Sequence, residues 1–170
     1  MIVVSDTSPI TNLAAIGQLD LLRQLYETIV IPVAVYNEMV AVGKLVPGAV
    51  EVQTLPWIQT QTVANAQSVI DVQSSRDDID LGEAEAIILA LELKAGLLLM
   101  DERRGRALAA NYGLSVTGLL GVLLQAKRNG LIQAVKPVMD QLIEEADFRI
   151  SSHLYAIVLK TADEEWISQK

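Results

Sequence analysis

Short apolar runs alternate with helical patterns along almost the whole chain, and this alternation restricts the possible folds more than any other feature. Runs at residues 2–4, 28–32 and 96–100 are typical of short strands buried on both faces. The segments between them carry apolar residues at helical spacing. Because strands that alternate with helices form right-handed βαβ units, we predict an α/β fold, a three-layer α/β/α sandwich with a mainly parallel sheet. Residues 1–170 are expected to form one domain.

Glycine and proline mark where the predicted elements begin and end. Ser8 followed by Pro9 resembles a helix N-cap with proline at the first helical position. Gly17 is expected to divide the first helical region in two. Pro32 is expected to end the second strand and to begin a helix that runs to Gly43. Further elements are expected as an extended segment after Pro56, a buried helix at 81–96, a short strand at 114–118, and helices at 102–113, at 118–130 and on both sides of 148–151.

The composition indicates an aliphatic core and an intracellular location. Apolar residues make up 51% of the chain but aromatic residues only 4%, which favours helices packed on a parallel sheet over an aromatic-rich β-sandwich. The chain has no cysteine, which excludes disulfides and thiolate metal sites. No apolar stretch reaches the ~20 residues of a membrane span. Because no basic region precedes the first apolar run, we expect no signal peptide and a cytoplasmic protein that does not associate with membranes.

Four acidic residues interrupt apolar elements near their ends: Asp6, Glu38, Glu83 and Asp101. Asp6 and Asp101 both follow buried strands, and the carboxyl ends of parallel strands meet at one edge of a sheet, where open α/β folds bind ligands. Glu38 lies in the helix after the second strand, and Glu83 opens the buried helix, so both can face that edge. Carboxylates gathered there repel one another unless protons or cations neutralise them.

The available ligand types point to a hard cation at this edge. Oxygen ligands, the absence of cysteine and a single histidine favour Mg²⁺ or Mn²⁺ over zinc. Two such ions about 3.5–4 Å apart can activate water and stabilise the leaving oxygen when a phosphodiester is cleaved. The net charge of −8 argues against a general electrostatic attraction to nucleic acid, although Arg103, Arg104 and Arg106 cluster beside Asp101. These features together predict a metal-dependent nuclease.

The chain resembles the PIN-domain nucleases in four motifs that occur in the same order: MIVVSDTSP, the Glu of IPVAVYNEMV, GEAEAIILA and LLLMDERRGR. The resemblance is closest to a bacterial and archaeal branch related to VapC-type toxins. It extends through VTGLLGVLLQAKRNGLI and so covers most of the chain. The resemblance implies a cleft of three or four acids that binds Mg²⁺ or Mn²⁺ and hydrolyses single-stranded RNA, leaving a 5′-phosphate and a 3′-hydroxyl. It also implies a small antitoxin protein and a second copy of the chain, in a homodimer, as partners.

Carried over to this sequence, the resemblance makes Asp6, Glu38, Glu83 and Asp101 the metal ligands and catalytic residues, in that order. At the third position Glu83 and Glu85 are alternatives, because two residues along a helix correspond to about 200° of rotation and cannot both face one metal. We favour Glu83, which lies nearer the helix start, where a carboxylate is stabilised. Many toxin relatives have aspartate there, which leaves the activity of this chain to be tested.

Four further residues are candidates for substrate binding or for positioning the acids. The resemblance implies that Thr7 and Ser8 hydrogen-bond the first carboxylate or a water molecule at the metal, with helix capping as the alternative for Ser8. Arg104 and Arg106 are expected to bind substrate phosphate, because a guanidinium pairs with phosphate through two hydrogen bonds. Neutralisation of the acids is the alternative role for both arginines.

Two other classes of protein fit parts of the pattern. A non-catalytic PIN-fold module that binds RNA or protein would account for the acidic charge, and it predicts no tight binding of divalent cations. A phosphatase or phosphoacceptor of the haloacid-dehalogenase or receiver kind also has an Asp after its first strand. Those phosphatases carry a second Asp two residues on, where this chain has Ser8. The absence of a Gly-rich phosphate loop argues against a P-loop or dinucleotide enzyme.

Overall fold

A parallel β-sheet forms the centre of the computed structural model, which describes residues 1–41, 43, 45–75 and 78–164. The five strands of the described chain lie in the order β3-β2-β1-β4-β5, and every neighbouring pair is parallel. They are β1 (Val3–Ser5), β2 (Ile29–Pro32), β3 (Ile58–Gln61), β4 (Leu97–Leu99) and β5 (Val116–Thr117). The predicted parallel α/β architecture is therefore confirmed.

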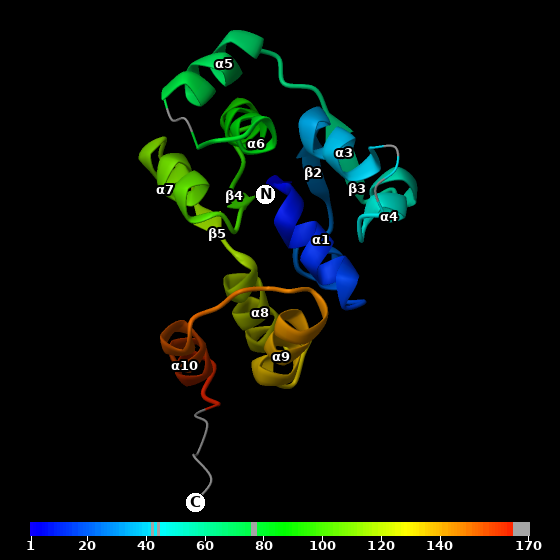
Figure 1. Cartoon of the computed structure of the whole chain (residues 1–170), viewed down its shortest axis with the longest axis vertical. Coiled ribbons are helices and arrows are strands. Elements are labelled where there is room, and N and C mark those ends of the chain that lie inside the picture. The colour runs from blue at the N-terminus through cyan, green and yellow to red at the C-terminus, as the bar shows by residue number, and fades with distance from the viewer. Residues whose placement is uncertain (42, 44, 76–77, 165–170) are drawn as a thin grey trace, which may run out of the picture.

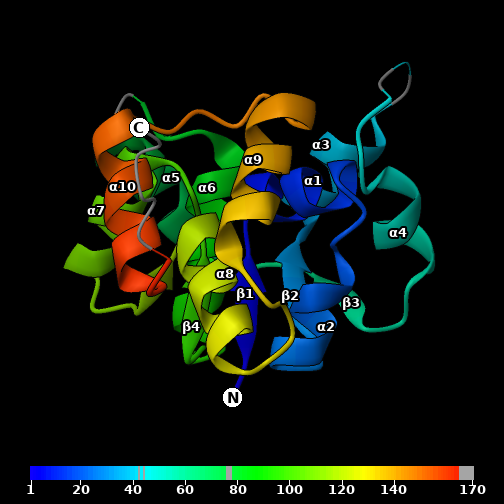
Figure 2. The same ribbon diagram turned by 90° about the horizontal axis from the view of Figure 1, so that it is seen from below.

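Helices cover both faces of this sheet, as the two views show (Figure 1, Figure 2). Helices α5, α6 and α7 pack on one face, and α8 and α9, with α1 and α2, pack on the other. The helices of the described chain are α1 (Thr7–Ala15), α2 (Asp20–Tyr26), α3 (Val33–Val40), α4 (Ala49–Thr54), α5 (Ala66–Ser75), α6 (Leu81–Glu92), α7 (Arg103–Asn111), α8 (Leu119–Arg128), α9 (Val135–Glu145) and α10 (Ser152–Thr161).

The central strands are apolar at every position because successive side chains enter opposite cores. Val3 packs in the cluster beneath α1, α8 and α9, whereas Val4 packs in the cluster beneath α5, α6 and α7. Leu98 and Leu99 of β4 divide in the same way. This is the period-two alternation of a strand that is covered on both sides. The first polar side chains after such strands therefore emerge at the carboxyl edge of the sheet.

Two predicted helix boundaries are wrong. Helix α1 begins at Thr7 with Asp6 at its N-cap position, so Ser8 is not the cap. The Asp6 N–H still continues the strand pairing, donating to the Leu99 carbonyl at 2.9 Å, and the helix starts directly after it. Helix α3 ends at Val40 rather than at Gly43.

Packing explains why α3 ends early, and it also explains the buried helix. Met39 is the last buried residue of α3, and Leu45 beyond it is fully exposed, so no core contact extends the helix. Gly17, with φ of +71°, separates α1 from α2 as predicted. Helix α6 is buried over most of its length, which confirms the prediction for this segment. No described helix is both long and apolar enough to cross a membrane.

Candidate metal centre

The first and fourth predicted acids lie at the carboxyl ends of neighbouring strands. Asp6 follows β1, and Asp101 follows β4 after the buried Met100. Strands β1 and β4 pair in parallel with Ser5 opposite Leu99, so the chain places both acids at the same edge of the sheet. The side chain of Asp6 is almost fully buried, with 7% of the residue exposed.

An open pocket of about 310 Å³, which we call the acidic pocket, occupies this edge. Three of the four predicted acids, Asp6, Glu38 and Glu83, line it together. Asp101 is not part of its lining and instead borders a neighbouring pocket. The complete lining consists of Asp6, Thr7, Ser8, Thr11, Glu38, Asp80, Glu83 and Glu102.

Glu83 is held at the start of α6 by a reciprocal capping box. The Glu83 N–H donates to Asp80 Oδ1 at 2.8 Å, and the Asp80 N–H donates to Glu83 Oε1 at 3.3 Å. The second oxygen, Glu83 Oε2, is buried and has no hydrogen-bond partner among the described residues. Gly105 of α7 allows this close packing, because a Cβ there would lie 2.9 Å from Glu83 Oε2 and 2.6 Å from Met100 Sδ.

Glu85 lies on a different side of α6 and has a structural role. Its Oε1 accepts a hydrogen bond from the Ala34 N–H at 3.0 Å, in the first turn of α3. It lines a separate, largely apolar pocket with Val33, Val69 and Ile70. Of the two alternatives for the third acid, only Glu83 lines the acidic pocket.

Two hydroxyl groups hold the second and fourth acids rather than the first. Thr7 Oγ1 donates to Glu38 Oε2 at 3.1 Å, and Ser8 Oγ donates to Asp101 Oδ2 at 3.0 Å. The expectation that these hydroxyls bind Asp6 is therefore wrong, because helix α1 starts two residues earlier than predicted and both side chains bond to other acids. Asn12 extends the network by donating to Ser8 Oγ at 2.9 Å.

Asp101 also accepts a backbone hydrogen bond from the start of α8. The Leu119 N–H donates to Asp101 Oδ1 at 2.6 Å, so both of its carboxylate oxygens have partners. A carboxylate at a helix N-terminus is stabilised by the unpaired N–H groups and the helix dipole. Asp101 is thus fixed by bonds from α1 and α8, whereas Glu83 keeps one oxygen without a bond.

Burial and mutual repulsion raise the pKa values of the acids. Burial is the main cause that raises the pKa of Asp6 to about 7, and the nearby Asp80, Glu38 and Asp101 charges add to it. Burial, followed by the charge of Asp80, raises the pKa of Glu83 to about 8. Burial also raises the pKa of Asp101, against the hydrogen bonds from Leu119 and Ser8 and the charge of Arg106. A site with these properties takes up protons or a cation near neutral pH.

The two predicted phosphate-binding arginines differ in position. Arg106 lies near Asp101, since a Cβ at Gly118 would be 3.1 Å from both Arg106 Nη1 and Asp101 Oδ1. Arg104 instead forms an ion pair with Asp78, at 2.8 Å, with 67% of its side chain exposed. Arg104 does not line the acidic pocket or the pocket beside it.

Sequence reasoning did not identify two acids of the pocket, Asp80 and Glu102. Asp80 had a detectable signal, because an acid three residues before a glutamate is the pattern of a capping box. Glu102 directly follows Asp101 and carries no pattern of its own. Glycine also contributes here, since a Cβ at Gly82 would lie 3.2 Å from Glu38 Oε2. Because Gly82 has no Cβ, space is left between α6 and the Glu38 carboxylate.

The donor set fits an oxygen-binding divalent cation. All candidate ligands are carboxylates, and a buried carboxylate oxygen without a hydrogen bond is an unsatisfied site for a cation or a proton. In the described part of the chain, no three acids lie close enough together to hold an ion with their side chains as they stand. Side-chain movement within the pocket would therefore have to accompany binding.

A parallel α/β fold with buried acids at the carboxyl edge of its central strands defines a class of proteins that bind ligands in that crevice. A family model described as a PIN domain matches residues 2–164. The chain therefore belongs to the PIN-domain family, whose members are generally nucleases. A search of curated proteins gives no match. The narrower likeness to VapC-type toxins stays a prediction.

Proposed function

We propose that this protein is an endoribonuclease that uses Mg²⁺ or Mn²⁺ to hydrolyse phosphodiester bonds of single-stranded RNA. Family membership supports a nuclease. The observation that carries the metal requirement is the buried Glu83 Oε2, which has no partner among the described residues and belongs to a side chain that lines the same pocket as Asp6. Leaving a buried carboxylate oxygen unpaired is costly, and a hard cation would supply the missing interaction.

In this proposal Asp6, Glu38 and Glu83 hold the cation from within the acidic pocket, and Asp101 holds it from the border. A divalent cation bound there supplies a water of lowered pKa and neutralises charge on the phosphate. Thr7 and Ser8 orient two of the carboxylates through their hydroxyl groups. Such supporting bonds to ligand side chains commonly change metal affinity 10- to 100-fold.

The raised pKa values of Asp6 and Glu83 mean that protons compete with the cation for these carboxylates. With the pKa of Asp6 near 7 and that of Glu83 near 8, the acidic pocket holds protons in neutral solution when it holds no metal. Cation binding must displace these protons, because ligands bind as carboxylates. We expect Mn²⁺ binding at pH 7 to release protons, which is measured by calorimetry in two buffers of different ionisation enthalpy. Binding enthalpies equal in both buffers would contradict this.

The direct test is cleavage of a mixed-sequence single-stranded RNA in Mn²⁺ and in EDTA. We expect cleavage in Mn²⁺ only, with product ends that carry a 5′-phosphate and a 3′-hydroxyl. Single-stranded DNA of the same sequence serves as the control for substrate class. Products with a 2′,3′-cyclic phosphate would contradict a mechanism in which water attacks the phosphorus.

One observation favours a second candidate, a PIN-fold module that binds RNA or protein without cutting. No three described acids are close enough to hold an ion as they stand, and the chain carries a net charge of −8. This candidate predicts no tight Mn²⁺ site. A calorimetric titration without Mn²⁺ binding, together with no cleavage by folded protein, would favour it over the nuclease.

The likeness to VapC-type toxins extends the proposal to a toxin with a small antitoxin partner, acting as a homodimer in the cytoplasm. A toxin is expected to stop bacterial growth when its synthesis is induced, whereas an Asp6→Asn variant made at the same level is not. For a homodimer, light scattering should give twice the 18.5 kDa mass of one chain. Normal growth under induction would contradict the toxin role, and a mass of 18.5 kDa would contradict the homodimer.

A further inference from the structure

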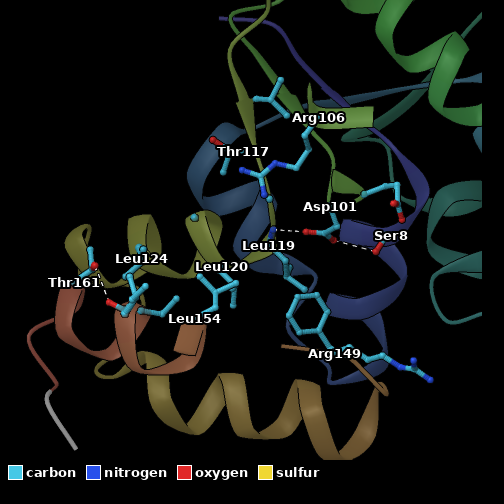
Figure 3. Close-up of a pocket in the computed structure, with 17 residues that line it drawn as sticks. Ser8, Asp101, Arg106, Thr117, Leu119, Leu120, Leu124, Arg149, Leu154 and Thr161 are labelled. Carbon is cyan, nitrogen blue, oxygen red and sulfur yellow. Dashed lines mark hydrogen bonds between the residues drawn. The ribbon is translucent and has the colours of Figure 1, made fainter. Parts of the chain in front are cut away.

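A second and larger pocket, of about 580 Å³, lies directly beside the acidic pocket. We call it the arginine pocket, after Arg106 and Arg149 in its lining. Ser8 and Glu102 line both pockets, and Asp101 faces the arginine pocket. The close-up shows Ser8 and Asp101 at one end, and Leu124, Leu154 and Thr161 at the other (Figure 3). A molecule that occupies the arginine pocket therefore extends to the candidate metal ligands.

The end of the arginine pocket away from the acids is apolar and incompletely covered. Leu120 and Leu124 of α8 face Leu154 and Ile157 of α10 across it, with Phe148 also in the lining. Leu154 is 42% exposed and Ile157 is 45% exposed, although both are large aliphatic residues. Apolar side chains gathered in an open hollow are typical of a binding surface.

The arginine pocket also provides cationic groups, which are unusual in a chain of net charge −8. Arg106 and Arg149 are both exposed and line the pocket. The four ion pairs within the described part of the chain involve other cations, namely Arg23, Arg104, Lys127 and Lys136. A guanidinium with its donors available matches a phosphate through two parallel hydrogen bonds.

The walls of the arginine pocket are fixed by hydrogen bonds outside it. Three residues after the end of α10, the Glu164 carboxylate accepts from the Val135 N–H at 2.7 Å and from Lys127 Nζ at 2.9 Å. Earlier in α10, the Tyr155 hydroxyl donates to Asp140 Oδ1 at 2.5 Å. These bonds attach α10 to α8 and α9, so the pocket is largely formed before any ligand enters. Such preorganisation reduces the free-energy cost of ordering on binding.

We propose that the arginine pocket binds a nucleotide of a single-stranded nucleic acid next to the bond to be cut, with a base against Phe148 and the leucines and a phosphate on Arg149 and Arg106. This inference rests on the proposed nuclease function. Stacking surfaces beside cations are the features with which proteins bind single strands. An apolar protein segment is the competing occupant, but it would make no use of the Arg149 guanidinium, which forms no ion pair within the described residues.

The test uses methyl NMR of the Asp6→Asn variant, which keeps the arginine pocket intact, titrated with an RNA tetranucleotide in EDTA and, separately, in Mg²⁺. We expect the methyl signals of Leu120, Leu124 and Leu154 to shift in a saturable manner. Adding Arg149→Ala should raise Kd about five- to tenfold. Arg128→Ala is the matched control, because Arg128 is an exposed arginine of α8 that does not line this pocket.

Kinetics of the wild-type protein give a second readout. Arg149→Ala and Leu154→Ser should each raise KM for RNA about five- to tenfold and leave kcat unchanged, since neither residue lines the acidic pocket. Both side chains are exposed, so neither change should prevent folding.

The outcomes separate this inference from the nuclease proposal. Shifts at the three leucines without any cleavage by the wild-type protein would support the nucleotide pocket and remove the nuclease. Cleavage with unchanged KM in both variants would remove the pocket and keep the nuclease. A folded protein whose leucine methyl signals do not shift with RNA in either buffer would also overturn the inference, leaving a protein segment as the occupant.

Discussion

The acidic pocket and the arginine pocket share a border but are constructed in opposite ways. The acidic pocket is formed at the end of β1 by residues of α1, α3 and the first turn of the buried helix α6. Two of its carboxylates, Asp6 and Glu83, are buried, whereas Glu38 is exposed. The arginine pocket is formed by partly buried side chains of α8 and by exposed side chains of α7, α10 and the connection before α10. Under the proposed function, this difference is a division of work in which the centre of the fold would hold the cation and the outer helices would bind the RNA.

The strongest test of this division is removal of the first acid. Asp6→Asn should lower RNA cleavage on the order of 10³-fold or more, because it removes a buried ligand from a group of residues that act together. It should leave RNA binding in the arginine pocket unchanged. Cleavage assays and NMR titration measure the two effects. Asp20→Asn is the matched control, because Asp20 is in an exposed ion pair with Arg23, and it should leave cleavage unchanged. RNA cleavage by the Asp6→Asn protein at the wild-type rate would contradict the division.

The next effect is a pH dependence of stability that the two buried acids of the acidic pocket, Asp6 and Glu83, should cause. A raised folded-state pKa means that the folded protein keeps protons which the unfolded chain loses above about pH 4. Stability of the metal-free protein should therefore fall as pH rises from 5 to 8.5, by about 3 kcal/mol from Asp6 alone and further from Glu83. Above the folded pKa values of about 7 and 8, the decrease should level off.

Urea denaturation in EDTA at several pH values measures this dependence. Asp6→Asn should make the slope smaller, because the substituted side chain does not titrate. Saturating Mn²⁺ should also reduce it, since the cation stabilises the carboxylates in the charged form. A midpoint that rises or stays constant from pH 5 to 8.5 would show that the acids are not buried as described.

A matched pair of glutamates on α6 tests the acidic pocket at the level of single side chains. Glu83→Gln should lower cleavage on the order of 100-fold and weaken Mn²⁺ binding, because it replaces the carboxylate with the unpaired oxygen. Glu85→Gln should change cleavage less than about threefold, since Glu85 binds the Ala34 N–H. Its cost should be a stability loss of about 1 kcal/mol from weaker capping of α3. Equal losses of cleavage in both variants would contradict the assignment.

The smallest expected difference concerns the two arginines of α7. Arg106→Ala should raise KM for RNA roughly tenfold, because Arg106 lines the arginine pocket near Asp101. Arg104→Ala should change KM less than about twofold and stability by less than about 1 kcal/mol, since its ion pair with Asp78 is exposed. A larger effect of Arg104→Ala on KM would mean that substrate extends beyond both pockets.

Features that depend on local patterns could be predicted from the sequence. The buried strands and the buried helix follow from apolar runs, and strand direction then brings Asp6 and Asp101 to one edge. Helix geometry also separates Glu83 from Glu85, because they lie on different sides of α6. These predictions succeed because each depends on one element or on the parallel order of the strands.

Features that depend on contacts between distant segments could not be predicted. Ser8 binds Asp101 because α1 begins two residues earlier than proline placement suggests, and Arg104 pairs with Asp78 rather than with the acids of the pocket. The arginine pocket requires α8, α10 and α7 to meet, and no spacing along the chain encodes that contact. The apolar side chains of this pocket, such as Leu154 and Ile157, are exposed in the structure, but the sequence does not show which apolar residues are exposed.

The position of β1 at the centre of the sheet has a consequence for biosynthesis. Among the described strands, β1 is synthesised first, and its partner β4 follows 92 residues, or about half of the 170 residues, later. Contacts so distant in sequence form late, because the intervening loop must close first. A growing polypeptide therefore cannot assemble Asp6 with Asp101 until translation has passed β4.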